Sequence, residues 1–167
     1  IPAPSGAANP YADKSVFVTN LTGTMFKYDN CDAKGTRSIA NELMRADADP
    51  SIIGHIIVAD SGGGAVNAVW EMADAITKCT KPVVAFVDGL AGSACMYAIS
   101  YCDKIIASHG TDMVGSIGVL TELSGFTKYA KDGNYVTARI YADASTEKNA
   151  GYEAALEGDF KIIKETQ

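Results

Sequence analysis

Ser93 is the residue of this chain best placed to act as a nucleophile. It follows a short apolar run from Pro82 to Val87 and precedes a segment, Ala94 to Cys102, that contains neither proline nor glycine. The first segment predicts a buried strand and the second a helix. A hydroxyl at such a junction lies beside backbone N–H groups that can stabilise an oxyanion. Serine is also a favoured N-cap residue, so a capping role is the alternative.

A second strand-to-helix turn contains three consecutive glycines. The apolar residues 56–59 predict another buried strand, and Gly62, Gly63 and Gly64 separate it from a segment with apolar residues at helical spacing. Glycine backbone can present N–H groups to a developing negative charge or to a phosphate. The phosphate alternative is weaker, because the third glycine of a dinucleotide site and the lysine of a P-loop are both missing. We therefore expect a cradle for an oxyanion or a peptide backbone.

Five short motifs follow one another between residues 61 and 119. They are Ser61-Gly-Gly-Gly64, Lys81-Pro-Val-Val84, Gly92-Ser-Ala-Cys-Met-Tyr97, Asp103-Lys-Ile105 and Gly115-Ser-Ile-Gly-Val119. In this order they resemble peptidase family S49, the signal peptide peptidase A group, which shares the ClpP/crotonase fold. Two positions depart from the family pattern, because Gly62 stands in place of a proline and Ala94-Cys95 in place of a glycine pair. The second departure narrows the space beside the serine.

The resemblance implies a catalytic dyad with Ser93 as nucleophile and Lys148 as general base. A lysine can act as a base at neutral pH only when desolvation lowers its pKa. Lys148 follows a predicted strand at residues 135–141, in the window where the family places its lysine, although the family's local Gly-x-x-Lys-Asp context is absent. A solvated loop lysine is the alternative.

The resemblance also implies groups that support the dyad. Ser116 would hydrogen-bond the lysine amine and orient it toward the nucleophile, and a role in turning its own loop is the alternative. For the oxyanion hole we expect the backbone N–H of Gly63 or Gly64 together with that of Ala94.

The histidines and cysteines are assigned no chemistry. A ClpP-like Ser-His-Asp triad needs a histidine, but neither His55 nor His109 is well placed, and we expect both to be surface or loop residues. No His, Cys, Asp or Glu residues have metal-ligand spacing, so we expect no metal, and no cofactor is implied. Cys95 would point away from the N-terminal amides of its helix and ranks well below Ser93. The cysteines show no CxxC pairing, which favours packing roles and a reducing compartment.

Composition restricts the partners. The 167 residues carry 14 Lys and Arg against 20 Asp and Glu, a formal charge of −6, and no basic run that could neutralise phosphates. We therefore expect no nucleic-acid binding. No stretch of 18 apolar residues occurs, so we expect no membrane span in this segment and a cytoplasmic location, or membrane association if a segment outside this sequence carries an anchor.

The order of apolar patterns predicts the fold class. We expect strands at residues 16–21, 53–60, 82–88, 104–107 and 135–142, and helices at residues 36–49, 65–78, 93–101, 121–131 and 151–164. This alternation predicts an α/β fold with a mainly parallel central sheet, and the family resemblance implies ClpP/crotonase-like repeated β-β-α units. Residues 1–14 are expected to form an extended N-terminal arm. Residues 15–167 are expected to form a single S49 peptidase-like domain, truncated at its C-terminus.

Two classes of function follow from these features. The first is a serine endopeptidase that cleaves extended peptide or protein substrates and works as a homo-oligomer. The second is a non-hydrolytic relative, either a crotonase-like acyl-thioester enzyme or an inactive scaffold that binds peptide. Lys148 separates the two classes, because only the peptidase requires a general base.

Overall fold

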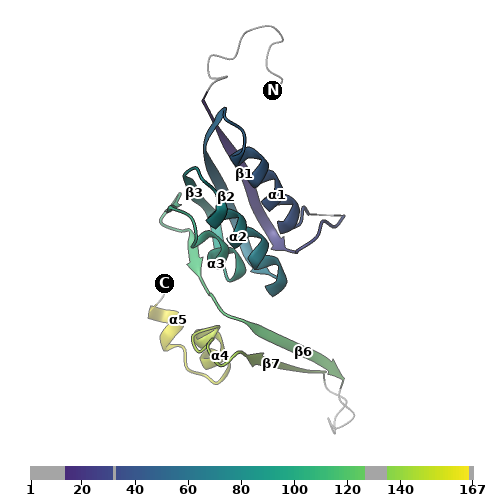
Figure 1. Ribbon diagram of the computed structural model, residues 1–167. Coiled ribbons are helices and arrows are strands. Elements are labelled where there is room, and N and C mark those ends of the chain that lie inside the picture. Colours follow the sequence, from purple (N-terminus) through teal and green to yellow (C-terminus); the bar gives the residue numbers. More distant parts are fainter. Residues whose placement is uncertain (1–13, 32, 127–134, 166–167) are drawn as a thin grey trace. The chain divides into compact units, whose positions relative to one another are not determined.

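The computed structural model describes residues 14–31, 33–126 and 135–165 (Figure 1). They divide into two compact units, one ending at Gly115 and the other beginning at Ser116. Each unit is described below by itself. The single domain expected over residues 15–167 stays a prediction, and the expected N-terminal arm lies outside the described residues except for Lys14.

The first unit is built on a five-stranded parallel sheet. Its strands are β1 (Ser15–Met25), β2 (Ile52–Gly64), β3 (Val83–Gly92), β4 (Lys104–Ala107) and β5 (Met113–Gly115). The order is β1-β2-β3-β4, and β5 pairs with the last residues of β3, beyond the part of β3 that pairs with β4. Helices α1 (Thr36–Asp47), α2 (Val69–Lys78) and α3 (Ala94–Ile99) alternate with the first strands, and a 3-10 turn (Val66–Ala68) leads into α2. The predicted α/β class with a mainly parallel sheet is confirmed.

The helices bury one face of this sheet, as Figure 1 shows. Alternate strand residues such as Ile57 and Ala85 form the core with Leu43 of α1 and Met72 of α2, and all four are fully buried. The intervening residues point to the other face and include large apolar side chains that are 37% to 54% exposed, namely Val16, Val18, Phe86 and Ile106. The core therefore lies between the sheet and its helices, and it fixes the turns at the carboxyl ends of β2 and β3.

The second unit pairs β6 (Leu120–Phe126) with β7 (Tyr135–Tyr141) in an antiparallel hairpin, followed by α4 (Ala150–Leu156) and α5 (Lys161–Glu165). The helix predicted at residues 121–131 is wrong, because β6 occupies the described part of that range. Cross-strand partners favour the strand: Glu122 pairs with Arg139 at 2.9 Å, and the Ser124 and Thr137 hydroxyls lie 3.3 Å apart.

Two further expectations for the second unit are modified. The strand predicted at residues 135–142 exists, but it lies in the hairpin rather than in the parallel sheet. The helix predicted at residues 151–164 is interrupted near Gly158, whose positive φ of 93° ends α4. Within the residues that the structure describes, no helix has the length and apolar character needed to cross a bilayer.

Candidate active site

Ser93 occupies the sharp turn between β3 and α3. Its backbone has φ 53° and ψ −118°, a conformation that glycine adopts readily and serine rarely does. Its N–H donates to the carbonyl of Gly115 at 2.8 Å, so the strained turn is tied to the end of β5. Its side chain makes no capping hydrogen bond to α3. The N-cap alternative therefore does not account for this serine.

The glycine turn at the end of β2 packs directly against Ser93. A Cβ placed on Gly63, which has φ 94°, would lie 2.7 Å from Ala94 N and 2.9 Å from Ser93 Cβ. Only a glycine permits this approach of the two turns. A Cβ on Gly64 would instead overlap the backbone of Met25 in β1. The structure thus brings Gly63, Ser93 and Ala94 together, while Gly64 faces the neighbouring strand.

Ser61 is part of this arrangement, and the sequence did not identify its role. The side chain is buried, its hydroxyl donates to the carbonyl of Gly23 at 2.5 Å, and it accepts the N–H of Gly63 at 3.1 Å. Ser61 therefore holds the glycine turn against β1. It also occupies the Gly63 N–H that was expected to stabilise an oxyanion, so a substrate oxygen would have to replace the serine hydroxyl. The Ser61-Gly-Gly motif was the available signal, because a buried serine beside flexible glycines needs a backbone partner.

Lys148 lies in the second unit and contacts Ser116 there. Its Nζ donates to the carbonyl of Ser116 at 2.7 Å and to the hydroxyl of Ser116 at 3.0 Å. Its aliphatic stem lies on Gly118, where a Cβ would come within 2.9 Å of Lys148 Cβ. Partial burial lowers the pKa of Lys148 below its ordinary value, the direction that a general base requires. The expected contact between the lysine and Ser116 is thus present in the structure.

The candidate site residues fall into two groups. Gly63, Ser93 and Ala94 belong to the unit that ends at Gly115, whereas Ser116 and Lys148 belong to the unit that begins at Ser116. Each group is organised by contacts within its own unit. Two other lysines, Lys128 and Lys131, are poorer candidates for the base because the sequence predicts a charged helix face there, and both lie outside the described residues.

The two histidines differ in environment. His109 lies in an exposed turn, as expected, with Nδ1 2.7 Å from the Ser108 hydroxyl. The surface position expected for His55 is wrong, because its side chain is fully buried on β2 and its Nε2 lies 3.0 Å from Asp47 Oδ1. Its contribution is therefore to the core of the first unit.

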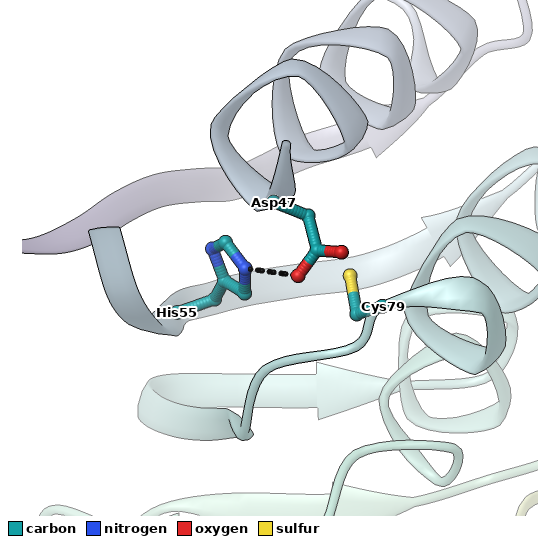
Figure 2. A group of neighbouring side chains, drawn as sticks. All are labelled: Asp47, His55 and Cys79. Carbon is teal, nitrogen blue, oxygen red and sulfur yellow. Dashed lines mark hydrogen bonds and ion pairs between the residues drawn. The ribbon is translucent and has the colours of Figure 1, made fainter. Parts of the chain in front are cut away.

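Asp47, His55 and Cys79 form a cluster that residue spacing did not predict (Figure 2). They come from the end of α1, from β2 and from the residue after α2, and their potential ligand atoms lie within 4.8 Å of one another. The Asp47 carboxylate already accepts four hydrogen bonds, from His55 Nε2, the N–H and hydroxyl of Thr80, and the N–H of Lys81.

These hydrogen bonds account for the cluster better than a metal ion does. An ionised carboxylate only accepts, so the proton of His55 belongs on Nε2. A metal on Nε2 would move that proton to Nδ1, which is buried without a partner among the described residues. Burial, followed by the charge of Asp47, also raises the pKa of the Cys79 thiol to about 11, which opposes the thiolate form that metals bind. The geometry therefore favours a buried hydrogen-bond network centred on the Asp47 carboxylate.

Cys95 lacks the features of a nucleophile. It is fully buried within α3, and burial raises the pKa of its thiol to about 11. A nucleophilic cysteine has a lowered pKa and is accessible. The packing role expected for Cys95 agrees with both features.

The sequence profile described as peptidase family S49 matches residues 75–152. The matched segment spans just under half of the chain. This S49 segment contains Ser93, Ser116 and Lys148, whereas the glycine turn of β2 lies before it.

Two curated proteins are similar to the chain. One is "Putative protease MJ0651" of Methanocaldococcus jannaschii, 35% identical over 92 residues that cover 54% of this chain and 29% of that protein. The other is the head-tail preconnector protein GP5 of Enterobacteria phage P21, 29% identical over 114 residues that cover 67% of this chain and 23% of that protein. The chain therefore matches less than a third of the length of either relative.

Solved structures share the fold of this chain. A serine-to-alanine mutant of the 1510-N membrane-bound stomatin-specific protease superposes with a TM-score of 0.59 at 18% identity, covering 86% of this chain and 61% of that one. A lysine-to-alanine mutant of the same protease, in complex with a substrate peptide, gives 0.56 at 20% identity over 87% and 60% of the two chains. At this level of identity the likeness concerns the fold.

Proposed function

We propose that this chain carries the catalytic residues of a serine peptidase, with Ser93 as nucleophile and Lys148 as general base. The match of residues 75–152 to the S49 peptidase profile and the protease name of the M. jannaschii relative support peptide hydrolysis as the reaction class. Extended peptide or protein segments are the proposed substrates. A crotonase-like enzyme or an inactive scaffold would need neither the nucleophile nor the base.

The observation that carries the proposal is the distribution of backbone strain. In the part of the chain that the structure describes, the non-glycine residues with positive φ are Ser93, Ser116 and Asn149. Two of them are site residues expected from the sequence, and the third directly follows Lys148. Such conformations cost about 1–3 kcal/mol each and concentrate at functional sites.

The proposed chemistry follows from the groups present. Ser93 Oγ attacks the carbonyl carbon of the peptide as its proton passes to the neutral amine of Lys148. The N–H of Ala94 and an N–H of the glycine turn stabilise the oxyanion. The lysine ammonium then gives the proton to the leaving amine as the C–N bond breaks, and water hydrolyses the acyl-enzyme. Ser116 accepts hydrogen bonds from the lysine amine and orients it.

A fluorophosphonate probe tests the nucleophile. The probe phosphonylates an activated serine, and intact-protein mass spectrometry should show one adduct on the wild type and none on Ser93→Ala. Ser100→Ala is the matched control, because Ser100 lies exposed at the end of the same helix and its hydroxyl donates to the carbonyl of Tyr97 in its own turn. An unlabelled wild type, or full labelling of Ser93→Ala, would contradict the assignment.

The same fluorophosphonate labelling assay tests Lys148 as the general base. Lys148→Arg should lower the labelling rate by several orders of magnitude, because arginine stays protonated and cannot accept the serine proton. Wild-type labelling should increase with pH as Lys148 loses its proton, with a midpoint below the ordinary lysine pKa because burial lowers it. A midpoint typical of histidine would point to a different base.

A further inference from the structure

Lys148 is carried by a loop, residues 142–149, that connects β7 to α4 and is hydrogen-bonded at several points. Its first residue, Ala142, donates its N–H to the carbonyl of Val119 at 3.0 Å, and the N–H of Val119 donates to Ser145 Oγ at 3.0 Å. The N–H of Lys148 donates in turn to the carbonyl of Ser145 at 3.1 Å. The start and middle of this lysine loop are therefore tied to the chain that follows Ser116.

The end of the lysine loop is held by Asn149 in an unusual way. Asn149 is the N-cap of α4, where an asparagine side chain normally accepts an N–H of the first helical turn. Here it makes no such bond, its backbone is left-handed with φ 59°, and its Nδ2 donates to the Tyr141 hydroxyl at 3.3 Å. Helix capping therefore does not explain the asparagine, and its side chain is directed to the last residue of β7.

Tyr141 connects this asparagine to α4. Its hydroxyl donates to Glu153 Oε1 at 2.6 Å, and Glu153 also accepts Arg139 Nη1 at 3.4 Å. Arg139 in turn binds Glu122 of β6 at 2.9 Å through Nε. The bond to Glu153, assisted by burial, raises the pKa of Tyr141, so the hydroxyl keeps its proton and remains a donor. One hydroxyl thus joins the end of the lysine loop, the first turn of α4 and the hairpin.

We propose that Tyr141 is a positioning residue for Lys148, through the hydrogen bonds that its hydroxyl makes to Asn149 and Glu153. This role rests on the function proposed above, because the lysine needs a fixed position only if it accepts a proton. Without the hydroxyl, the lysine loop keeps its bonds to Val119 but loses the restraint on the residue after Lys148. The amine is then free to leave Ser116 and to become more hydrated.

Tyr141→Phe in the full chain tests the proposal, with Thr137→Val as matched control. Thr137 lies on the same strand, and its hydroxyl meets only Ser124 across the hairpin in the contacts described. For hydrolysis of a fluorogenic peptide, Tyr141→Phe should lower kcat at least about tenfold with little change in KM, since misplacing a catalytic group by about 1 Å can cost about 100-fold. Its pH profile should shift upward as the amine becomes better solvated. Thr137→Val should match the wild type.

Asn149→Gly gives an independent variant, because glycine keeps the positive φ but removes the amide that binds Tyr141. It should shift kcat and the pH profile in the same direction as Tyr141→Phe. If both variants retain wild-type kcat and pH dependence, the positioning role is wrong.

Acetylation of the Lys148 amine by trace acetic anhydride, followed across pH by peptide mass spectrometry, reports its pKa without any enzymatic activity. A higher pKa in Tyr141→Phe than in Thr137→Val is expected. An unchanged pKa and reactivity would overturn the positioning role even in an active enzyme. A raised pKa together with a wild type that neither hydrolyses peptide nor reacts with the fluorophosphonate would instead overturn the proposed peptidase function and support the Tyr141 contact.

Discussion

Ser93 and Ser116 show how single residues store strain at the candidate site. Both have φ near 50°, a conformation in which the Cβ of an L-residue is crowded. Glycine would relieve this crowding but would remove the hydroxyl. Serine at these two positions therefore indicates that the hydroxyl is retained for function, although the strained backbone lowers the stability of the fold.

Stability measurements on two Ser93 variants test this interpretation. Ser93→Ala keeps the strained backbone, whereas Ser93→Gly relieves it, so the glycine variant should be more stable than the alanine variant by about 1 kcal/mol. Urea denaturation gives the difference directly. Both variants should be unreactive toward the fluorophosphonate. An alanine variant as stable as the glycine variant would mean that the turn is relaxed in solution.

Asp47 is a second residue whose environment has a measurable consequence. Burial by itself would raise the pKa of Asp47, but hydrogen bonds from Thr80, His55 and Lys81 outweigh it and lower the pKa from 3.8 to about 2. Because the folded pKa is the lower one, the carboxylate stabilises the fold above pH 4, and this contribution of about 2 kcal/mol is lost as pH falls toward 2. Urea midpoints measured between pH 7 and pH 2 should show the loss.

Asp47→Asn should remove this acid-dependent contribution and destabilise the protein at pH 7 by about 2–4 kcal/mol, because buried donors lose a charged acceptor. Asp74→Asn is the control. Asp74 is exposed and pairs with Lys78 at 3.5 Å on the surface of α2, so its replacement should change stability by less than about 1 kcal/mol. Equal effects of the two substitutions would show that the buried hydrogen-bond network of Asp47 does not form.

At the scale of elements, the contact that positions Ser93 and Ala94 is the one between the turn after β2 and the turn after β3. Gly63 lies against Ser93 and Ala94 so closely that a side chain has no room, whereas a Cβ added to the neighbouring Gly62 would meet only Leu90 Cδ2 among the described residues, at 3.6 Å. The two glycines are adjacent in sequence but differ in what surrounds them. The packing of one turn on the other, rather than turn flexibility in general, requires the glycine at position 63.

A pair of alanine substitutions separates these roles. Gly63→Ala should destabilise the first unit by about 1–3 kcal/mol and slow fluorophosphonate labelling of Ser93, because the new Cβ displaces the Ala94 amide and the positive φ is strained. Gly62→Ala should be close to neutral in urea denaturation and labelling alike. If the two variants behave identically, the close approach of the turns is not required.

At the scale of the whole molecule, exposed apolar side chains are the basis on which we expect association between chains. On α4 and in the segment before α5, Leu156 is 62% and Phe160 52% exposed, and the open face of the first unit's sheet exposes further large apolar residues. Extended apolar patches on a monomer usually mark interaction surfaces. We expect a homo-oligomer.

Charged substitutions provide the test of oligomerisation. Leu156→Glu combined with Phe160→Glu should shift sedimentation velocity profiles toward monomer and reduce peptidase activity in parallel. Lys164→Glu, a charge reversal on α5, serves as the control and should leave the association state unchanged. A wild type that sediments as a fully active monomer at assay concentration would contradict this prediction.

The sequence by itself determined the features that depend on neighbouring residues. The apolar runs and glycines around Ser61-Gly-Gly-Gly64 and Gly92-Ser93 predicted two buried strands ending in turns beside helices, and both are present. The motif order also indicated the S49 family, which the profile match confirms. The reason is that turn-forming glycines and apolar runs can be recognised within short, contiguous segments.

Tertiary structure decided the features that depend on distant partners. Residues 120–126 form a strand because residues 135–141 pair with them, although their local pattern suggested a helix. His55 is buried because its Nε2 reaches the Asp47 carboxylate, which also accepts hydrogen bonds from Thr80 and Lys81. Gly63 donates to Ser61 because β1 holds that serine. Tyr141 meets Asn149 and Glu153 only after the hairpin and α4 are in place. Cross-strand pairing and the satisfaction of buried polar groups are non-local, so residue spacing alone could not predict them.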